Sequence, residues 1–220
     1  MQHNKGSRQI VWDLPLRLVH WSVVALFATM WWSAEVDQWD IHRYAGYLLA
    51  GVMVFRVYWG LAGASNARFS NMFSRPGHVW QYARHLFKRH YGASAGHNPL
   101  GAYSALLLIT LLCLQVVLGL FAIDVDGWEG GPFSDYVSFD TARWCAQWHE
   151  IVFNLLLALV CLHIAAVGYY WLWRGQNLLR AMITGKSAAQ PLQPTRFARP
   201  LHYVLGILLA ATVSFLLYTW

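Results

Sequence analysis

The feature that most constrains this chain is an apolar stretch, residues 144–173, that carries two histidines. After Glu150 no charged residue occurs until Arg174, and a run of this length can cross a bilayer as one helix. His149 and His163 are close to four helical turns apart, so both leave nearly the same face, on the order of 21 Å apart along the axis. Ionisable residues within a membrane span are functional candidates.

The composition indicates a membrane protein with several spans. Hydrophobic residues make up 57% of the 220 and charged residues 12%, about half the charge of a soluble domain. Thirteen Trp and eleven Tyr fit interfacial aromatic belts. The net charge of +6 is segregated by loop, which is typical of membrane topology and not of nucleic-acid binding. None of Cys113, Cys145 and Cys161 forms a C-x-x-C-H motif or a disulfide framework.

The uncharged stretches predict five membrane-spanning helices. Asp13 is a suitable N-cap for the first, and Asn98-Pro99 has the cap-then-proline pattern at the start of the third. The N-terminal apolar run is long and has no small-x-small cleavage site, so we expect it to remain as a helix. The middle of the longest link, about His78 to His90, fits a helix on the membrane surface. The predicted spans are about 14–34, 41–61, 99–123, 146–173 and 201–220.

The links between these spans alternate in charge. Residues 62–98 and 174–199 carry Arg and Lys without Asp or Glu, whereas residues 35–40 and 124–147 are mainly acidic. Basic loops face the cytoplasm. We therefore expect a protein of the bacterial inner (cytoplasmic) membrane, with a cytoplasmic N-terminus and a periplasmic C-terminus.

This topology assigns a depth to four histidines. His20 lies near the cytoplasmic end of the first span and His42 near the outer end of the second. The fourth span descends from outside, so His149 is outer and His163 is deeper. The depths pair His42 with His149 and His20 with His163. Two imidazoles on one iron suit a low-spin haem that transfers electrons without binding a substrate.

These residues allow other interpretations. A zinc site needs about four ligands converging on one metal, which pairs at two depths do not provide. A single membrane histidine is often only an interhelical hydrogen-bonding residue, but two depth-matched pairs favour two haem b groups. Arg56 and Arg43 are candidate partners of the inner and outer haem propionates, and equally they can extend to the interface. The remaining histidines are expected on solvated faces: His3, His78, His85, His90, His97 and His202.

Six segments resemble the bacterial cytochrome b561 family. They are VWDLPLRLVHW, RYAGY, FRVYWG, GHNPLG, WHEIVFN and LHIAA, and the likeness covers about residues 10–186. It is nearest to the b-type cytochrome subunits of membrane-bound hydrogenases and to small stand-alone di-haem cytochromes b. The resemblance implies a four-helix haem-binding bundle whose ligands map onto His20, His42, His149 and His163. We expect a di-haem domain over 1–186 and a linker with a fifth helix, which could dock a partner, over 187–220.

The sequence thus predicts an all-α integral membrane protein that carries electrons through two b haems. The family likeness implies exchange between a quinone, ubiquinone or menaquinone, and a redox protein such as a c-type cytochrome. One alternative is a stand-alone superoxide:quinone oxidoreductase, which the acidic outer links disfavour because superoxide is an anion. Another is the membrane-anchor subunit of a hydrogenase-like complex, and a third is a non-redox scaffold or transporter. Whether the chain is a carrier or a subunit of a quinone-linked enzyme stays open.

Overall fold

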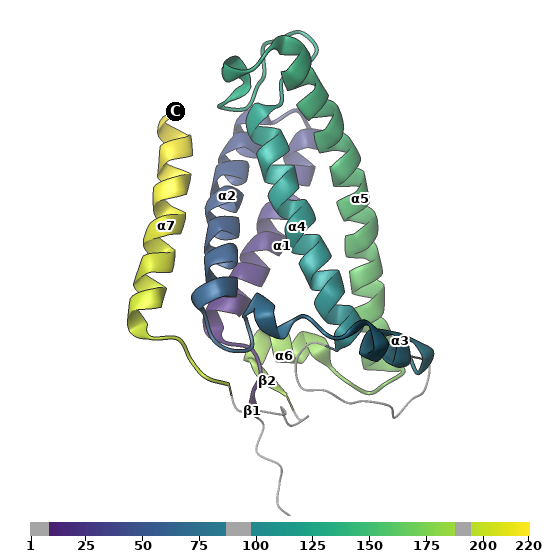
Figure 1. Cartoon of the computed structure of the whole chain (residues 1–220). Coiled ribbons are helices and arrows are strands. Elements are labelled where there is room, and N and C mark those ends of the chain that lie inside the picture. Colours follow the sequence, from purple (N-terminus) through teal and green to yellow (C-terminus); the bar gives the residue numbers. More distant parts are fainter. Residues whose placement is uncertain (1–8, 87–97, 188–194) are drawn as a thin grey trace, which may run out of the picture. The chain divides into compact units, whose positions relative to one another are not determined.

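The computed structural model describes residues 9–86, 98–187 and 195–220, and these are mostly helical (Figure 1). Five of the helices are long and apolar enough to cross a membrane. This confirms the all-α membrane class and the five predicted spans. The long helices are α1 (Leu14–Glu35), α2 (Trp39–Ala62), α4 (Pro99–Phe121), α5 (Phe139–Leu172) and α7 (Pro200–Thr219). The short elements are α3 (Pro76–Arg84), α6 (Leu178–Thr184), the 3₁₀ turns η1 (Phe69–Asn71) and η2 (Ser134–Tyr136), and strands β1 (Gln9–Ile10) and β2 (Lys186–Ser187).

Local capping explains where the helices begin. The Asp13 carboxylate accepts from Leu16 N at 3.3 Å, and Asn98 Oδ1 accepts from Gly101 N at 2.8 Å, which confirms both predicted caps. The predicted start of α5 near residue 146 is wrong, because it rested on the uncharged part of the helix alone. The helix begins at Phe139, where Ser138 caps it through the amide of Thr141.

The surface helix expected over His78 to His90 is α3 in part. This helix ends at Arg84, and residues 87–90 lie outside the described part of the chain. Its two faces differ, because Tyr82 is buried and Val79 half-buried, whereas Gln81 and Arg84 are exposed. An amphipathic helix of this kind suits an interface.

The chain forms two compact units, each of which takes segments from all five long helices. Unit 1 comprises the described residues of Met1–Leu18, Trp59–Leu106 and Cys161–Tyr203. Unit 2 comprises Val19–Tyr58, Leu107–Val160 and Val204–Trp220. These units group segments in space and do not test the predicted sequence boundary at residue 187, which stays a prediction.

Unit 1 is held together by short elements and buried polar groups. Strands β1 and β2 pair antiparallel, with Gln9 opposite Ser187 and Ile10 opposite Lys186. Buried Arg174 donates to the Tyr82 hydroxyl at 3.0 Å, and that hydroxyl lies 2.8 Å from the Tyr170 hydroxyl. These contacts attach α3 to the last turns of α5.

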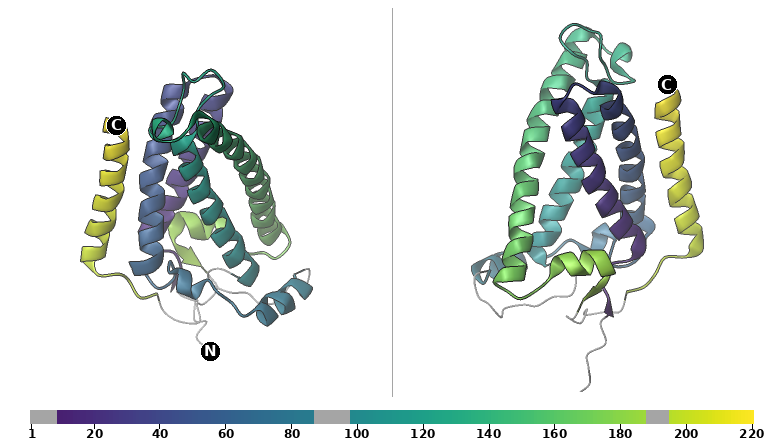
Figure 2. Two further views of the ribbon diagram at one scale, coloured as in Figure 1. Left: turned by 45° about the horizontal axis from the view of Figure 1, so that its top comes forward. Right: turned by 180° about the vertical axis from the view of Figure 1, so that it is seen from behind.

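Unit 2 has an apolar core between the segments of α1, α2, α4 and α5 that belong to it. These segments run side by side in the views of Figure 1 and Figure 2. The link after α4 folds back onto that helix, because the amides of Gly131 and Phe133 donate to the carbonyls of Ala122 and Leu120 at 2.8 and 2.9 Å. Buried side chains of the core are Leu49, Met53, Leu112, Leu118, Cys145, Val152 and Leu156.

Helix α7 packs closely on α2 within unit 2. A Cβ on Gly51 would lie 2.6 Å from the carbonyl oxygen of Ala210, and one on Gly206 would lie 2.8 Å from the Phe55 ring. Ser214 Oγ donates to the Tyr47 carbonyl at 3.1 Å. Small residues at such a contact let helix backbones approach each other in a membrane. One face of α7 therefore packs against α2 of the same chain.

Candidate functional site

The structure brings His42 and His149 together in unit 2. His42 lies in the first turns of α2 and His149 in α5, and their ring centroids are 6.2 Å apart with an angle of 68° between the planes. Both side chains are partly buried. The predicted outer pair therefore forms a facing pair of imidazoles, because α2 and α5 run in the same direction and carry the two histidines toward the same end (Figure 1).

Each imidazole is oriented by a backbone carbonyl of a neighbouring helix. His42 Nδ1 lies 3.0 Å from Met30 O on α1, and His149 Nδ1 lies 3.0 Å from Gln115 O on α4. Since a carbonyl only accepts, Nδ1 is the protonated nitrogen in both rings. This leaves Nε2 with its lone pair on each ring, as metal-binding histidines require.

Gly119 makes room for the His149 ring. A Cβ at this position of α4 would lie 2.9 Å from His149 Cε1 and 3.2 Å from Nδ1. Any larger residue would push the imidazole off its present position. The glycine therefore serves the placement of a side chain on α5.

This pair fits the ligand set of one haem. The two rings, with centroids 6.2 Å apart, would hold the haem iron through their Nε2 atoms, and the haem would supply one-electron transfer. Among the described residues, no three His, Cys, Asp or Glu side chains converge as a metal cluster. The site thus offers two ligands, which suits a metal whose other bonds come from a macrocycle.

His20 and His163 belong to different units. His20 lies in the unit 2 part of α1, is partly buried, and has its ring centroid 5.1 Å from that of Trp21. His163 lies in the unit 1 part of α5 and is exposed. The structure supplies each histidine on the expected helix, and their pairing stays a prediction.

The two candidate arginines have different surroundings. Arg56 is 5% exposed, so this guanidinium is enclosed by protein. Arg43 pairs with the carboxylates of Asp40 and Glu129, so its charge is compensated at the acidic end of α2. Roles for either cation toward a haem propionate stay predictions.

The other histidines show no comparable arrangement where they are described. His78 is exposed on α3, and His85 Nδ1 lies 2.7 Å from the Gln81 carbonyl of the same helix. His202 is in the first turn of α7 and lines a cavity of unit 1. His3, His90 and His97 lie outside the described residues.

Sequence reasoning missed the groups that orient the ligands. The carbonyls of Met30 and Gln115 carry no sequence signal, because every residue has one. Gly119 had a signal, since a glycine inside an apolar helix often marks a close approach. That signal says that something approaches, but not which side chain.

Comparisons with known proteins identify the family of the chain. The family model described as prokaryotic cytochrome b561 matches residues 11–185. A probable Ni/Fe-hydrogenase B-type cytochrome subunit of Rhizobium leguminosarum bv. viciae is 28% identical over 66% of this chain, and the match spans 66% of that protein, just under two thirds of its length. Subunits with the same name from Azotobacter chroococcum mcd 1 and Azotobacter vinelandii are 25% identical, over 82% of this chain and 89% of theirs. No solved structure matches.

Proposed function

The chain belongs to the prokaryotic cytochrome b561 family of membrane electron-transfer proteins, and we propose that it moves electrons between the quinone pool and a protein redox partner through two b haems. The partner would be a c-type cytochrome or another extracytoplasmic redox protein. The chain itself would lie in the inner membrane, with the basic links in the cytoplasm and the acidic links in the periplasm, because basic loops stay on the cytoplasmic side.

The facing imidazoles of His42 and His149 carry this proposal. A haem with two imidazole ligands exchanges electrons without binding a substrate at the iron. The protein's own contribution is orientation. The two Nδ1–H groups donate hydrogen bonds to helix carbonyls, which fixes the rings and makes Nε2 a stronger metal ligand. Gly119 leaves the space that His149 needs.

The second haem would use His20 and His163. His163 follows His149 on α5 by close to four helical turns, on the order of 21 Å along the axis, and His20 lies on α1. A second site at this depth would extend the electron path toward the opposite face of the membrane. Enclosed Arg56 would neutralise a propionate there, since a buried carboxylate needs a partner. Arg43 would neutralise a propionate of the outer haem less completely, because it also pairs with the carboxylates of Asp40 and Glu129.

The charge of unit 2 favours a basic protein partner. Its links carry most of the acidic residues of the chain, and complementary charge accelerates association. The same charge repels superoxide, so the stand-alone superoxide:quinone oxidoreductase is disfavoured. Complementary recognition would therefore occur at the end that holds the His42–His149 pair.

A second candidate is the membrane-anchor cytochrome of a hydrogenase-like complex. Relatives described as probable Ni/Fe-hydrogenase B-type cytochrome subunits match over 89% of their length. The electron path would be the same, and only the donor protein would differ. Purification of the chain with an attached catalytic subunit would favour this candidate over a freely diffusing cytochrome partner.

Haem stoichiometry tests the proposal directly. A pyridine haemochrome assay on the purified protein should give two haems per chain, and acid acetone should extract both, since no thioether attaches them. Quinol added to membranes should reduce them. One haem per chain, haem that resists extraction, or haem that quinol leaves oxidised would contradict the proposal.

A further inference from the structure

A cavity of about 340 Å³ lies within unit 1, between the loop after α2 and the start of α7. The segment before α7 is attached to that loop, because the amide of Arg196 donates to Ser65 Oγ and the amide of Ser65 donates to Arg196 O, both at 3.0 Å. The cavity is therefore built by two chain segments joined by specific hydrogen bonds. Its lining residues are Ala62, Ser65, Arg68, Arg196, Phe197, Ala198, Arg199 and His202.

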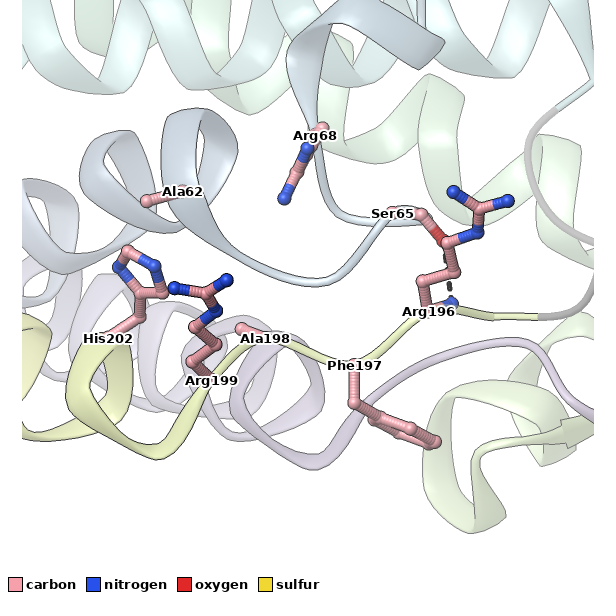
Figure 3. A pocket seen from close by; sticks show the side chains of 8 residues that line it. All are labelled: Ala62, Ser65, Arg68, Arg196, Phe197, Ala198, Arg199 and His202. Atoms are coloured by element: carbon pink, nitrogen blue, oxygen red, sulfur yellow. Dashed lines mark hydrogen bonds between the residues drawn. The ribbon is translucent and has the colours of Figure 1, made fainter.

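The lining is rich in cations. Figure 3 shows Arg68, Arg199 and His202 extending toward the same space, with the Arg196 guanidinium beside Ser65 at the opposite edge. Arg68 Nε donates to the Gly63 carbonyl at 2.9 Å, which fixes the direction of its guanidinium. Of the described residues that line the cavity, none is Asp or Glu.

No carboxylate nearby in the described part of the same unit is available to these arginines. Asp13 is the one acidic residue of unit 1 among those described. It is 2% exposed and accepts from Leu16 N and Trp59 Nε1. The arginines therefore form an anion site rather than an internal ion-pair network. Arginine binds phosphate oxygens well because its planar donors match them.

The start of α7 adds to this preference for anions. Helix α7 begins at Pro200, directly after Arg199, and the positive end of the helix dipole favours negative charge at a first turn. His202 belongs to that turn and lines the cavity. Helix geometry and side-chain charge thus act on the same small volume.

Exposed apolar side chains on and next to the lining segments indicate the source of the anion. Phe197 lines the cavity and is 58% exposed. Leu61 and Leu201, which directly precede the lining residues Ala62 and His202 in the chain, are 69% and 63% exposed. They lie in α2 and α7, two of the helices that can cross a membrane. A phosphate that carries acyl chains would use both the arginines and these apolar side chains.

We propose that the cavity lined by Arg68, Arg199 and His202 binds the phosphate headgroup of an anionic phospholipid at the membrane surface. Basic pockets at the ends of membrane helices suit this ligand class. The lipid would join the loop after α2 to the start of α7. This inference depends on the membrane location and not on the haem ligands, so its failure leaves the electron-transfer proposal untouched.

Native mass spectrometry of the full-length haem-loaded protein in detergent tests the proposal. The probes are phosphatidylglycerol, phosphatidylcholine and inorganic phosphate at matched concentrations. We expect one retained phosphatidylglycerol per chain, weaker retention of phosphatidylcholine, and no displacement by phosphate. Equal retention of both lipids would overturn the proposal, and displacement by phosphate would assign the cavity to a free anion instead.

A charge-neutral variant locates the lipid. Arg199→Gln should weaken phosphatidylglycerol binding about fivefold, the value of one arginine at an anionic lipid surface. Arg75→Gln removes the same charge from an exposed position outside the cavity and should leave binding unchanged. If Arg199→Gln yields no haem-containing protein, Arg68→Gln is compared with Arg75→Gln in its place. Equal binding by the cavity variant and the control would overturn the proposal.

Discussion

Unit 1 and unit 2 take segments from the same five helices, yet they differ in the charge of their side chains. The described cations of unit 1 are Arg17, Arg68, Arg75, Arg84, Arg174, Arg180, Lys186, Arg196 and Arg199, with Asp13 as the one described acid. Unit 2 has only Arg43, Arg56 and Arg143 as cations, with Glu35, Asp37, Asp40, Asp124, Asp126, Glu129, Asp135, Asp140 and Glu150.

The comparison distinguishes the role of loop charge from the role of helix packing. Loop charge would decide which partners approach each unit, and our proposals are a basic protein for unit 2 and an anionic lipid for unit 1. Ligand placement depends on helix packing instead: His42 and His149 are oriented by backbone groups and by the space at Gly119. Charge can therefore be changed at the links without disturbing the imidazoles.

The largest expected effect comes from removing ligands. His42→Ala and His149→Ala should each lose the same haem, or convert it to high spin, leaving about half of the haem in a pyridine haemochrome assay, because one axial bond is lost. His20→Ala and His163→Ala should do so to the other haem. Redox-titrated spectra distinguish the two haems.

Exposed His78 supplies the control, since His78→Ala should keep both haems. The pairing would be wrong if His20 and His149 affected one haem while His42 and His163 affected the other.

A steric change at Gly119 should act on one haem alone. Gly119→Val places atoms within about 3 Å of the His149 ring, so the imidazole must move, and its proposed bond to a haem iron would weaken. We expect a high-spin fraction in the absorption spectrum of the outer haem. Gly168→Val is the matched control on α5, because no atom lies within 4 Å of a Cβ there. Equal spectra for the two variants would contradict this role of Gly119.

Overpacking between α2 and α7 should reduce stability. Gly51→Leu forces α7 away from α2, because even a Cβ would lie 2.6 Å from the Ala210 carbonyl oxygen. Overpacking of this kind costs about 1–3 kcal/mol, which a lower thermal unfolding midpoint of the haem-loaded protein would report. Gly77→Leu, at a position with no atom within 4 Å, should leave the midpoint unchanged. Equal midpoints for both variants would mean that α7 is loosely attached.

Neutralising Arg56 should shift one potential without removing a haem. A cation near a haem favours the reduced form, so Arg56→Leu should lower one midpoint potential by tens of millivolts, on the order expected for a unit charge about 10 Å away. The spectrum should remain low-spin. Unchanged midpoint potentials of both haems would show that Arg56 has only a structural role.

The smallest effect is expected at Arg43. Its pairs with Asp40 and Glu129 are partly exposed, with side-chain exposures of 32%, 75% and 41%, so Arg43→Gln should cost about 1 kcal/mol or less. The loss in thermal midpoint should shrink at high salt because salt screens the pairs. A loss that salt leaves unchanged, or one no different from that of Arg75→Gln, would contradict this interpretation.

Much of the fold was predictable because membrane spans are set by long uncharged runs. The five helices and the caps at Asp13 and Asn98 follow from composition and local chemistry. The early start of α5 was missed because its first turns are polar and only Ser138 marks them. Contacts between helices, such as Gly51 with α7, were not predictable, since glycine reports closeness without naming the neighbour.

Of the candidate site, the nearness of His42 and His149 was predictable, but the groups that orient them were not. The two histidines were paired from loop charge and helix direction, and their ring centroids are 6.2 Å apart. Their hydrogen bonds to Met30 O and Gln115 O depend on the rotation of each helix. That rotation is set by packing, which a single sequence does not express.

The hydrogen bonds from His42 and His149 to helix carbonyls bear on how the protein assembles in the membrane. His42 attaches α2 to α1, and His149 attaches α5 to α4; each bond joins helices that follow one another along the chain. Helical hairpins of this kind can insert as units before they associate. A metal bound by both imidazoles would then fasten one hairpin to the other. In cells starved of haem, the hairpins would lack this fastening, and we expect the newly made chain to be degraded rather than stored.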